Sequence, residues 1–162
     1  MVETNRQLPD RPQAVLLDCL GTLVRLEPPP ARLRMELAYR RIWVSEKAAA
    51  AAFRAEVAHY LEHHLEGSDA ASLELLRDDC ARVMVDALEV ERSATGAVRE
   101  AMLAALRFRP YPDAAAALRA LRAAHMRLVV TSNWDCSLPE VLAEAGLLAL
   151  VDAVVTSAGT GA

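Results

Sequence analysis

The chain lacks the features that mark membrane, secreted and nucleic-acid-binding proteins. It has no apolar run long enough to span a bilayer, and its N-terminal MVETNRQLPDRP has no signal-peptide stretch, so we expect a cytoplasmic protein without membrane contact. Its three cysteines, Cys19, Cys80 and Cys136, are widely separated and form no CxxC pair, which indicates neither a disulfide framework nor a zinc site. A net charge of −4 with scattered arginines argues against a nucleic-acid partner.

Lysine is almost absent. Lys47 is the only one, whereas alanine and arginine abound, which indicates a GC-rich and therefore bacterial coding sequence. With 162 residues, 54% hydrophobic and 25% charged, the chain fits one globular domain or one domain plus a small insertion.

Three short apolar runs predict buried strands. The first lies in Ala14–Leu23, carries Asp18 at its end and breaks at Gly21. The second is Met126–Asn133, and the third is Leu150–Val155. Each run ends in polar residues, so each predicted strand delivers polar groups at its carboxyl end.

Helical patterns fill most of the sequence between these strands. Residues 26–30, LEPPP, predict a linker, because proline excludes a helix interior and a central strand. Residues 31–108 then show helical spacing, with Ser45 and Asp69 as N-caps. Tyr111-Pro112-Asp113 starts another helix.

One further helix is predicted between the second and third strands. Residues 137–140, SLPE, have the spacing of a capping box, and Gly146 is placed to end the helix that follows.

This order of elements is typical of a parallel α/β sheet with right-handed crossovers. We predict a Rossmann-like, three-layer parallel-sheet core from residues 1–24 and 110–162, with an inserted all-helical cap at residues 25–109. Ligands bind beyond the carboxyl ends of the strands in such sheets. Three groups of polar residues converge there: Asp18, Thr131-Ser132-Asn133 and Thr156-Ser157.

Two motifs and their spacing resemble those of the haloacid dehalogenase (HAD)-like hydrolases. DCLGTL at residues 18–23 is similar to the family's first motif, in which an aspartate precedes Gly-Thr, and VVTSNWD at residues 129–135 is similar to the second. A long helical insertion follows the first motif, as in the helical-cap subgroup. The resemblance covers essentially the whole chain.

The resemblance implies specific roles. Asp18 would be the nucleophile that forms a covalent intermediate, although an aspartate there also fits an ordinary turn. Ser132 and Asn133 would bind the transferring group, although TSN also fits a polar loop. In the family's phosphatases Mg²⁺ bridges the nucleophile, here Asp18, the backbone carbonyl two residues later, here Leu20, and a downstream acid.

The chain departs from the family pattern in two places. Leu20 stands where phosphatases usually have the aspartate that protonates the leaving group, and dehalogenating members lack that acid too. The lysine of the third motif and the acidic pair of the fourth are missing, and Lys47, in the helical insertion, is no substitute. We therefore expect either a C-terminally incomplete piece of an enzyme or a naturally short, non-catalytic protein.

The function predicted from the sequence is hydrolysis of a small phosphorylated metabolite through an aspartyl intermediate. The alternatives are a C–halogen hydrolase and a non-catalytic binding or regulatory protein. We also expect homo-oligomers, because the first strand would expose an unpaired edge.

Histidines gather in the helical insertion. His59 and His63 lie one helical turn apart with His64 beside them, a spacing that binds metal in some proteins, but no HExxH pattern accompanies them. An exposed or cap-lining role is the better interpretation. Glu56, Tyr60 and His64 share one helix face, which would either line the substrate pocket or pack in the ordinary way.

Overall fold

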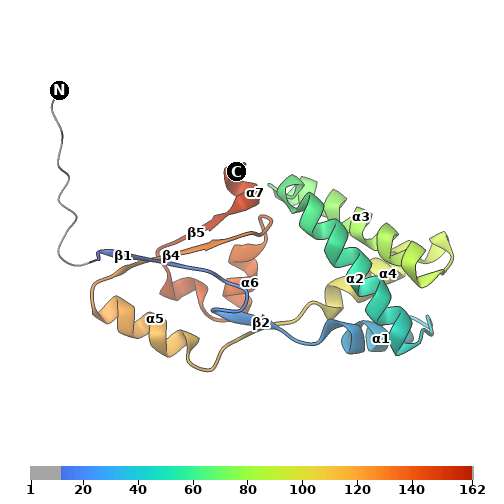
Figure 1. Cartoon of the computed structure of the whole chain (residues 1–162), viewed down its shortest axis with the longest axis horizontal. Helices are drawn as coiled ribbons and strands as arrows, with labels where there is room; N and C mark the ends of the chain where they lie inside the picture. The colour runs from blue at the N-terminus through green and yellow to red at the C-terminus, as the bar shows by residue number, and fades with distance from the viewer. Residues whose placement is uncertain (1–11, 162) are drawn as a thin grey trace.

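The computed structural model describes residues 12–161 and shows two lobes, a sheet with its helices and a bundle of helices (Figure 1). The sheet lobe is formed by both ends of the described chain, and the helical lobe by its middle. We call them the core and the cap. Among residues 12–161 no helix is long and apolar enough to cross a bilayer.

The core sheet has three parallel strands in the order β1-β4-β5. They are β1 (Ala14–Leu17), β4 (Arg127–Ser132) and β5 (Ala153–Thr156). β1 and β4 fall within the first two predicted apolar runs, and β5 overlaps the third and extends one residue beyond it. Leu17 is level with Val130, and Ser132 is level with Thr156, so the carboxyl ends lie together. The predicted Rossmann-like α/β class is confirmed.

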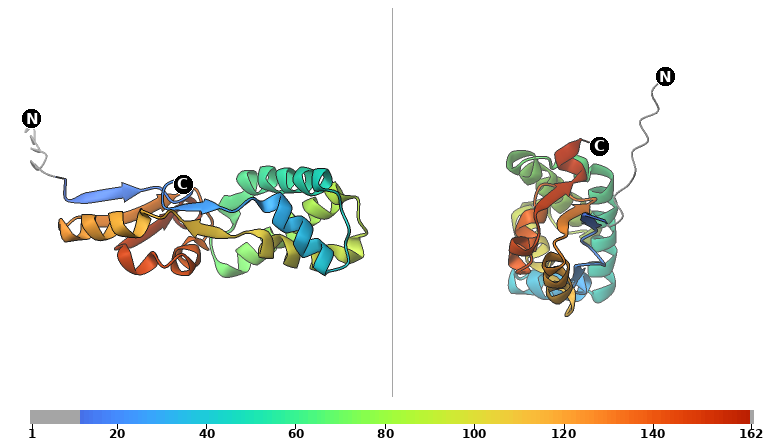
Figure 2. Two further views of the ribbon diagram at one scale, coloured as in Figure 1. Left: turned by 90° about the horizontal axis from the view of Figure 1, so that it is seen from below. Right: turned by 90° about the vertical axis from the view of Figure 1, so that its left-hand side faces the viewer.

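One face of this sheet is covered by helices α5 (Ala114–Ala123) and α6 (Leu138–Glu144), which both lie on the same side of the strands in Figures 1 and 2. A short turn, η3 (Leu148–Leu150), follows α6, and α7 (Ser157–Thr160) follows β5. The apolar cluster between sheet and helices includes Val15, Leu17, Leu118, Leu128, Val130, Leu138, Leu142 and Val154.

The opposite face of the sheet is open within residues 12–161. Leu16 and Val155, which point away from α5 and α6, are 69% and 38% exposed. The connections from β1 to β4 and from β4 to β5 both move in the same direction across the sheet. Because such connections are right-handed, both place their helices on the same face. Of the three predicted layers, the described residues therefore form the sheet and one helical layer, with β1 at the edge.

The cap consists of four helices joined by short turns. They are α1 (Pro29–Tyr39), α2 (Glu46–His63), α3 (Ala70–Leu88) and α4 (Thr95–Ala105), with η1 (His64–Glu66) and η2 (Arg92–Ala94) between them. In this bundle α2 packs against α3, and α1 against α4. Its apolar centre includes Leu33, Leu37, Leu73, Leu76, Met84, Val98 and Met102.

The two N-caps predicted in the cap are confirmed, whereas the capping box predicted at Ser137 in the core is not formed. Ser45 accepts a hydrogen bond from the Ala48 N–H, and Asp69 forms a capping box with Ser72. Ser137 begins α6, but its side chain makes no capping bond. Its Oγ accepts instead from the indole N–H of Trp134, and its own N–H donates to Asp135.

A two-stranded antiparallel ribbon, the neck, joins cap and core. It pairs β2 (Val24–Leu26) with β3 (Phe108–Pro110). The prediction of a linker at residues 26–30 was wrong, because Leu26 ends a strand and Pro29 starts α1, where a missing N–H costs nothing. The predicted helical region ends at Ala105, before β3. Both expected domain boundaries fall inside or beside the neck.

Glu56 is an acidic side chain inside the apolar cap. It lies on α2, is only 5% exposed, and shares a hydrogen bond with Cys80 of α3. Burial disfavours the charged carboxylate and raises the pKa of Glu56 from 4.5 to about 7. Between pH 4.5 and about pH 7, Glu56 is therefore protonated in the folded chain and ionised in the unfolded chain.

This proton makes the stability of the fold depend on pH. Since the folded state binds more protons, the free energy of unfolding falls as pH rises from about 4.5 to about 7, by on the order of 3 kcal/mol. Glu56→Gln is expected to remove this fall, so that the variant exceeds the parent chain at pH 8 and matches it at pH 4.5. Urea unfolding across this range measures it. Glu62→Gln, an exposed change on the same helix, should follow the parent, and parallel curves for Glu56→Gln would contradict the argument.

Candidate active site

Asp18 lies directly after β1, where the chain turns sharply. The N–H groups of Leu23 and Val24 donate to the Cys19 carbonyl at 2.8 and 3.0 Å, which folds residues 19–24 into a tight loop. Gly21 has φ +86°, a left-handed conformation that glycine adopts without strain. Burial and the Asp18 carboxylate raise the pKa of the Cys19 thiol to about 11, so Cys19 is no nucleophile at neutral pH.

Ser132 is the partner of Asp18. It ends β4, the strand beside β1, and its Oγ donates to Asp18 Oδ1 at 3.0 Å. Asp18 is followed by the loop of the first motif and Ser132 by Asn133, so the pairing of two parallel strands brings both motifs together. The carboxylate is held by one hydrogen bond and remains accessible.

An open hollow of about 430 Å³ lies beside these residues at the carboxyl ends of the strands. In Figure 1 these ends face the cap. The hollow joins the predicted Asp18, Ser132 and Asn133 to residues from β5 and α7, and most of its lining is hydroxyl-bearing. Its lining residues are Asp18, Thr131, Ser132, Asn133, Val155, Thr156, Ser157 and Thr160.

The residues near the hollow provide some, but not all, of the oxygen ligands that a hard cation such as Mg²⁺ needs. Asp18 supplies a carboxylate and Leu20 a backbone carbonyl, the oxygen ligands that Mg²⁺ takes, and Mg²⁺ sites often use one or two carboxylates with water and substrate phosphate. Within residues 12–161 no cluster of three or more His, Cys, Asp or Glu side chains is placed to hold a metal ion. Leu20, two residues after Asp18, is 48% exposed.

Lys47 lies far from the hollow. It sits in the first turn of α2, whereas the other end of this 18-residue helix touches the core. An α-helix of that length spans about 27 Å. The expectation that Lys47 does not replace the missing lysine agrees with this position.

Polar contacts within three residue pairs dock the cap on the core beside the hollow. Tyr60 Oη donates to Asp135 Oδ2 at 2.9 Å, His64 Nε2 lies 3.1 Å from Ser157 Oγ, and the Cys136 N–H donates to the Gly67 carbonyl at 2.8 Å. Burial and the Asp135 carboxylate raise the pKa of the Tyr60 hydroxyl, which stays protonated as a donor. In Figure 1, α7 lies close to the end of α2.

Sequence reasoning identified part of this docking surface. Tyr60 and His64 do share a helix face that meets the core, but Glu56 is buried inside the cap. Asp135 lies in the second motif, but nothing in the sequence pattern indicated its contact with Tyr60. His59 stacks on His63, whose Nδ1 is 2.8 Å from Glu66 Oε1, and this pair lies outside the hollow's lining.

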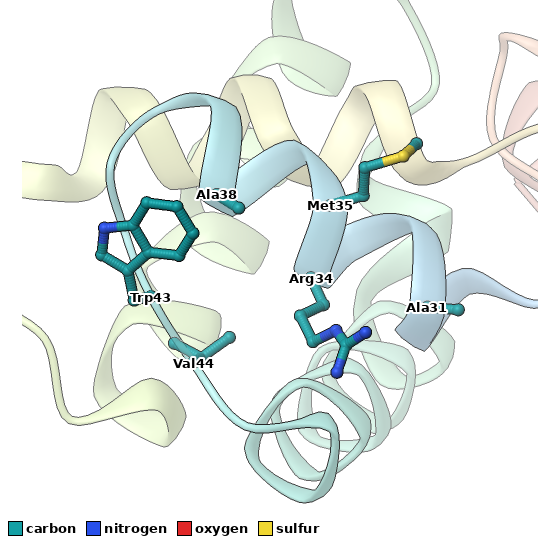
Figure 3. A pocket seen from close by; sticks show the side chains of 6 residues that line it. All are labelled: Ala31, Arg34, Met35, Ala38, Trp43 and Val44. Carbon is teal, nitrogen blue, oxygen red and sulfur yellow. The ribbon is translucent and has the colours of Figure 1, made fainter.

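A second hollow, of about 490 Å³, lies on the cap between α1 and the segment that leads into α2 (Figure 3). Arg34 is its one charged lining residue, and Trp43, at its rim, is 80% exposed. It contains no nucleophile or acid, and no core residue lines it. The hollow beside Asp18, although smaller, is therefore the candidate active site.

The chain matches a known protein family. Residues 12–162 match the family of haloacid dehalogenase-like hydrolases. This range includes both predicted motifs and the helical insertion. No protein among the curated proteins matches the chain.

Solved structures share the fold. An L-2-haloacid dehalogenase from Xanthobacter autotrophicus is 25% identical with a TM-score of 0.56, and the match covers 93% of this chain and 58% of that one. A defluorinating L-2-haloacid dehalogenase is 23% identical with a TM-score of 0.65, covering 90% and 60%. A putative β-phosphoglucomutase from Thermotoga maritima is 16% identical with a TM-score of 0.59, covering 91% and 62%. The chain thus spans about three fifths of the length of these proteins.

Proposed function

The chain belongs to the haloacid dehalogenase-like hydrolases, and we propose on that basis that its activity runs through a covalent intermediate on Asp18. The observation that carries this proposal is the hydrogen bond from Ser132 to Asp18 at the mouth of the hollow. Ser132 engages Oδ1, so we take Oδ2 as the attacking oxygen. A carboxylate that becomes acylated or phosphorylated splits one difficult displacement into two easier steps.

The substrate class we propose is a small phosphorylated metabolite. Hydroxyl groups of Thr131, Ser132 and Thr156 line the hollow with the Asn133 amide, and such neutral groups can donate to phosphate oxygens. The Asp18 carboxylate and the Leu20 carbonyl would hold Mg²⁺. When bound, Mg²⁺ neutralises phosphate charge and polarises the bond that breaks.

Leu20 favours a second candidate, hydrolysis of a carbon–halogen bond. Its apolar side chain is 48% exposed where the family's phosphatases carry an acid. A halide leaves without a proton, so this chemistry needs no acid at that position. The 25% identity to a haloacid dehalogenase points in the same direction.

Covalent trapping tests the proposal and separates the two substrate classes. The chain is incubated with p-nitrophenyl phosphate and Mg²⁺, or with 2-chloropropionate, quenched in acid, digested and examined by mass spectrometry. We expect phosphate on the peptide that contains Asp18. An ester on that peptide from the haloacid alone would select the second candidate, and an unlabelled Asp18 with both reagents would contradict the proposed activity of this chain.

A further inference from the structure

A proposed hydrolase of this kind needs a proton acceptor when water attacks the intermediate, and the hollow itself supplies none. Apart from Asp18, which is the group being released, its lining side chains are hydroxyls, one amide and one valine. None of these accepts a proton at neutral pH. Leu20, beside the nucleophile, cannot do so either.

His64 is the titratable cap residue joined to this hollow. Its Nε2 lies 3.1 Å from the Oγ of Ser157, which lines the hollow together with Asp18. His64 follows α2 directly, and the backbone bond from Cys136 to Gly67 fixes the next turn of the cap on the core. A Cβ at Gly67 would approach the Asp135 Cβ to 3.0 Å, so the two lobes are in close contact here.

The hydrogen-bond partners of His64 define its tautomer. Nδ1 lies 3.1 Å from the Leu61 carbonyl oxygen, which can only accept, so Nδ1 carries the hydrogen. In the neutral ring Nε2 is then an acceptor and faces the Ser157 hydroxyl. Ser157 Oγ accepts from the Trp134 N–H at 3.2 Å. This Oγ lies 3.1 Å from His64 Nε2 and 3.4 Å from the Trp134 carbonyl oxygen, so we assign its hydrogen to the shorter contact, with His64.

We propose that Ser157 and His64 form a proton relay for hydrolysis of the Asp18 intermediate, a role that rests on the proposed function. Water in the hollow gives a proton to Ser157 Oγ, while the Ser157 hydrogen passes to His64 Nε2. The water oxygen bonds to phosphorus as the bond from phosphorus to the Asp18 oxygen breaks, which yields inorganic phosphate and a free carboxylate. The imidazolium then returns its proton to solvent.

The cap therefore contributes the base. Ser157 comes from the core and His64 from the cap, so the relay exists only while the two lobes are docked. Tyr60, which donates to Asp135, and the contact at Gly67 hold them in that position.

Rapid-quench mass spectrometry with p-nitrophenyl phosphate and Mg²⁺ tests the relay in the full 162-residue chain. His64→Gln keeps a polar side chain of similar reach but accepts no proton, so phosphorylation of Asp18 should proceed at the parent rate while its hydrolysis slows by about 10²-fold. Phosphorylated chain should accumulate after a p-nitrophenol burst. His63→Gln, the neighbouring histidine paired with Glu66, is the matched control and should behave like the parent chain.

Other outcomes would overturn either the relay alone or the proposed function as well. Equal slowing of phosphorylation and hydrolysis in His64→Gln would assign His64 to cap docking and overturn the relay. Absence of phosphorylated chain in the parent protein would remove the proposed function, and the relay with it. Independently of turnover, ¹⁵N NMR should show His64 protonated at Nδ1 with an Nε2 resonance that moves in Ser157→Ala, and the opposite tautomer would overturn the relay alone.

Discussion

Asp18→Asn is expected to abolish both the covalent intermediate and turnover while the chain stays folded. Asparagine has the same size and keeps an oxygen that accepts from Ser132, but an amide is no nucleophile. Loss of an enzyme nucleophile lowers kcat by on the order of 10⁴- to 10⁶-fold. Steady-state hydrolysis and mass spectrometry of the Asp18 peptide measure the loss, and thermal unfolding by circular dichroism checks the fold.

A matched substitution separates loss of the nucleophile from loss of one acidic group. Asp113→Asn changes an exposed aspartate before α5 whose side chain makes no capping bond, and it should retain full activity. Residual turnover in Asp18→Asn at the parent KM, with a phosphorylated or alkylated residue elsewhere, would remove Asp18 from the mechanism.

Leu20→Asp should raise the hydrolysis of alkyl phosphates much more than that of activated aryl phosphates. An alkoxide leaves poorly without a proton, whereas p-nitrophenolate needs little help, and general acid catalysis contributes roughly 10²- to 10⁴-fold. Because Leu20 is 48% exposed, the new carboxylate is not forced into an apolar core. The measurement is the ratio of the two changes in kcat/KM within one variant, from which effects on folding cancel.

Leu20→Asn supplies the control for this substitution. It has nearly the shape of aspartate and the same exposure, but it cannot donate a proton, so both substrates should change together. An equal response of alkyl and aryl phosphates to Leu20→Asp would count against phosphatase chemistry, and turnover of a haloacid alone would support the carbon–halogen alternative.

The sequence predicted the elements that have a strong pattern and missed those that depend on contacts between distant segments. The apolar runs identified β1, β4 and β5, and helical spacing identified the cap. The strands of the neck have three residues each, too few to show an alternation, and Pro29 can begin a helix as readily as it can break one. At Ser137 the capping pattern was present, but Trp134 occupies the hydroxyl.

The candidate site likewise has a part that the sequence predicted and a part that only the structure shows. Asp18 and Ser132 were predicted to meet because parallel strands end at one edge of a sheet, and the hydrogen bond between them follows from that rule. The contact of His64 with Ser157 depends on how the turn after α2 docks on the start of α7. No periodicity in either segment encodes that docking, so only the three-dimensional arrangement reveals it.

The neck also shapes the order in which the chain can assemble. Ala14 pairs with Arg127 across the whole cap, and joining such distant segments costs conformational entropy that grows with the logarithm of the loop length. The ribbon pairs Val24 with Pro110, so once the cap and its ribbon have formed, only residues 18–23 and 111–126, which include α5, still separate β1 from β4. The local contacts of the cap thus bring the two halves of the core close together, and the loop that must still be closed to pair β1 with β4 becomes much shorter.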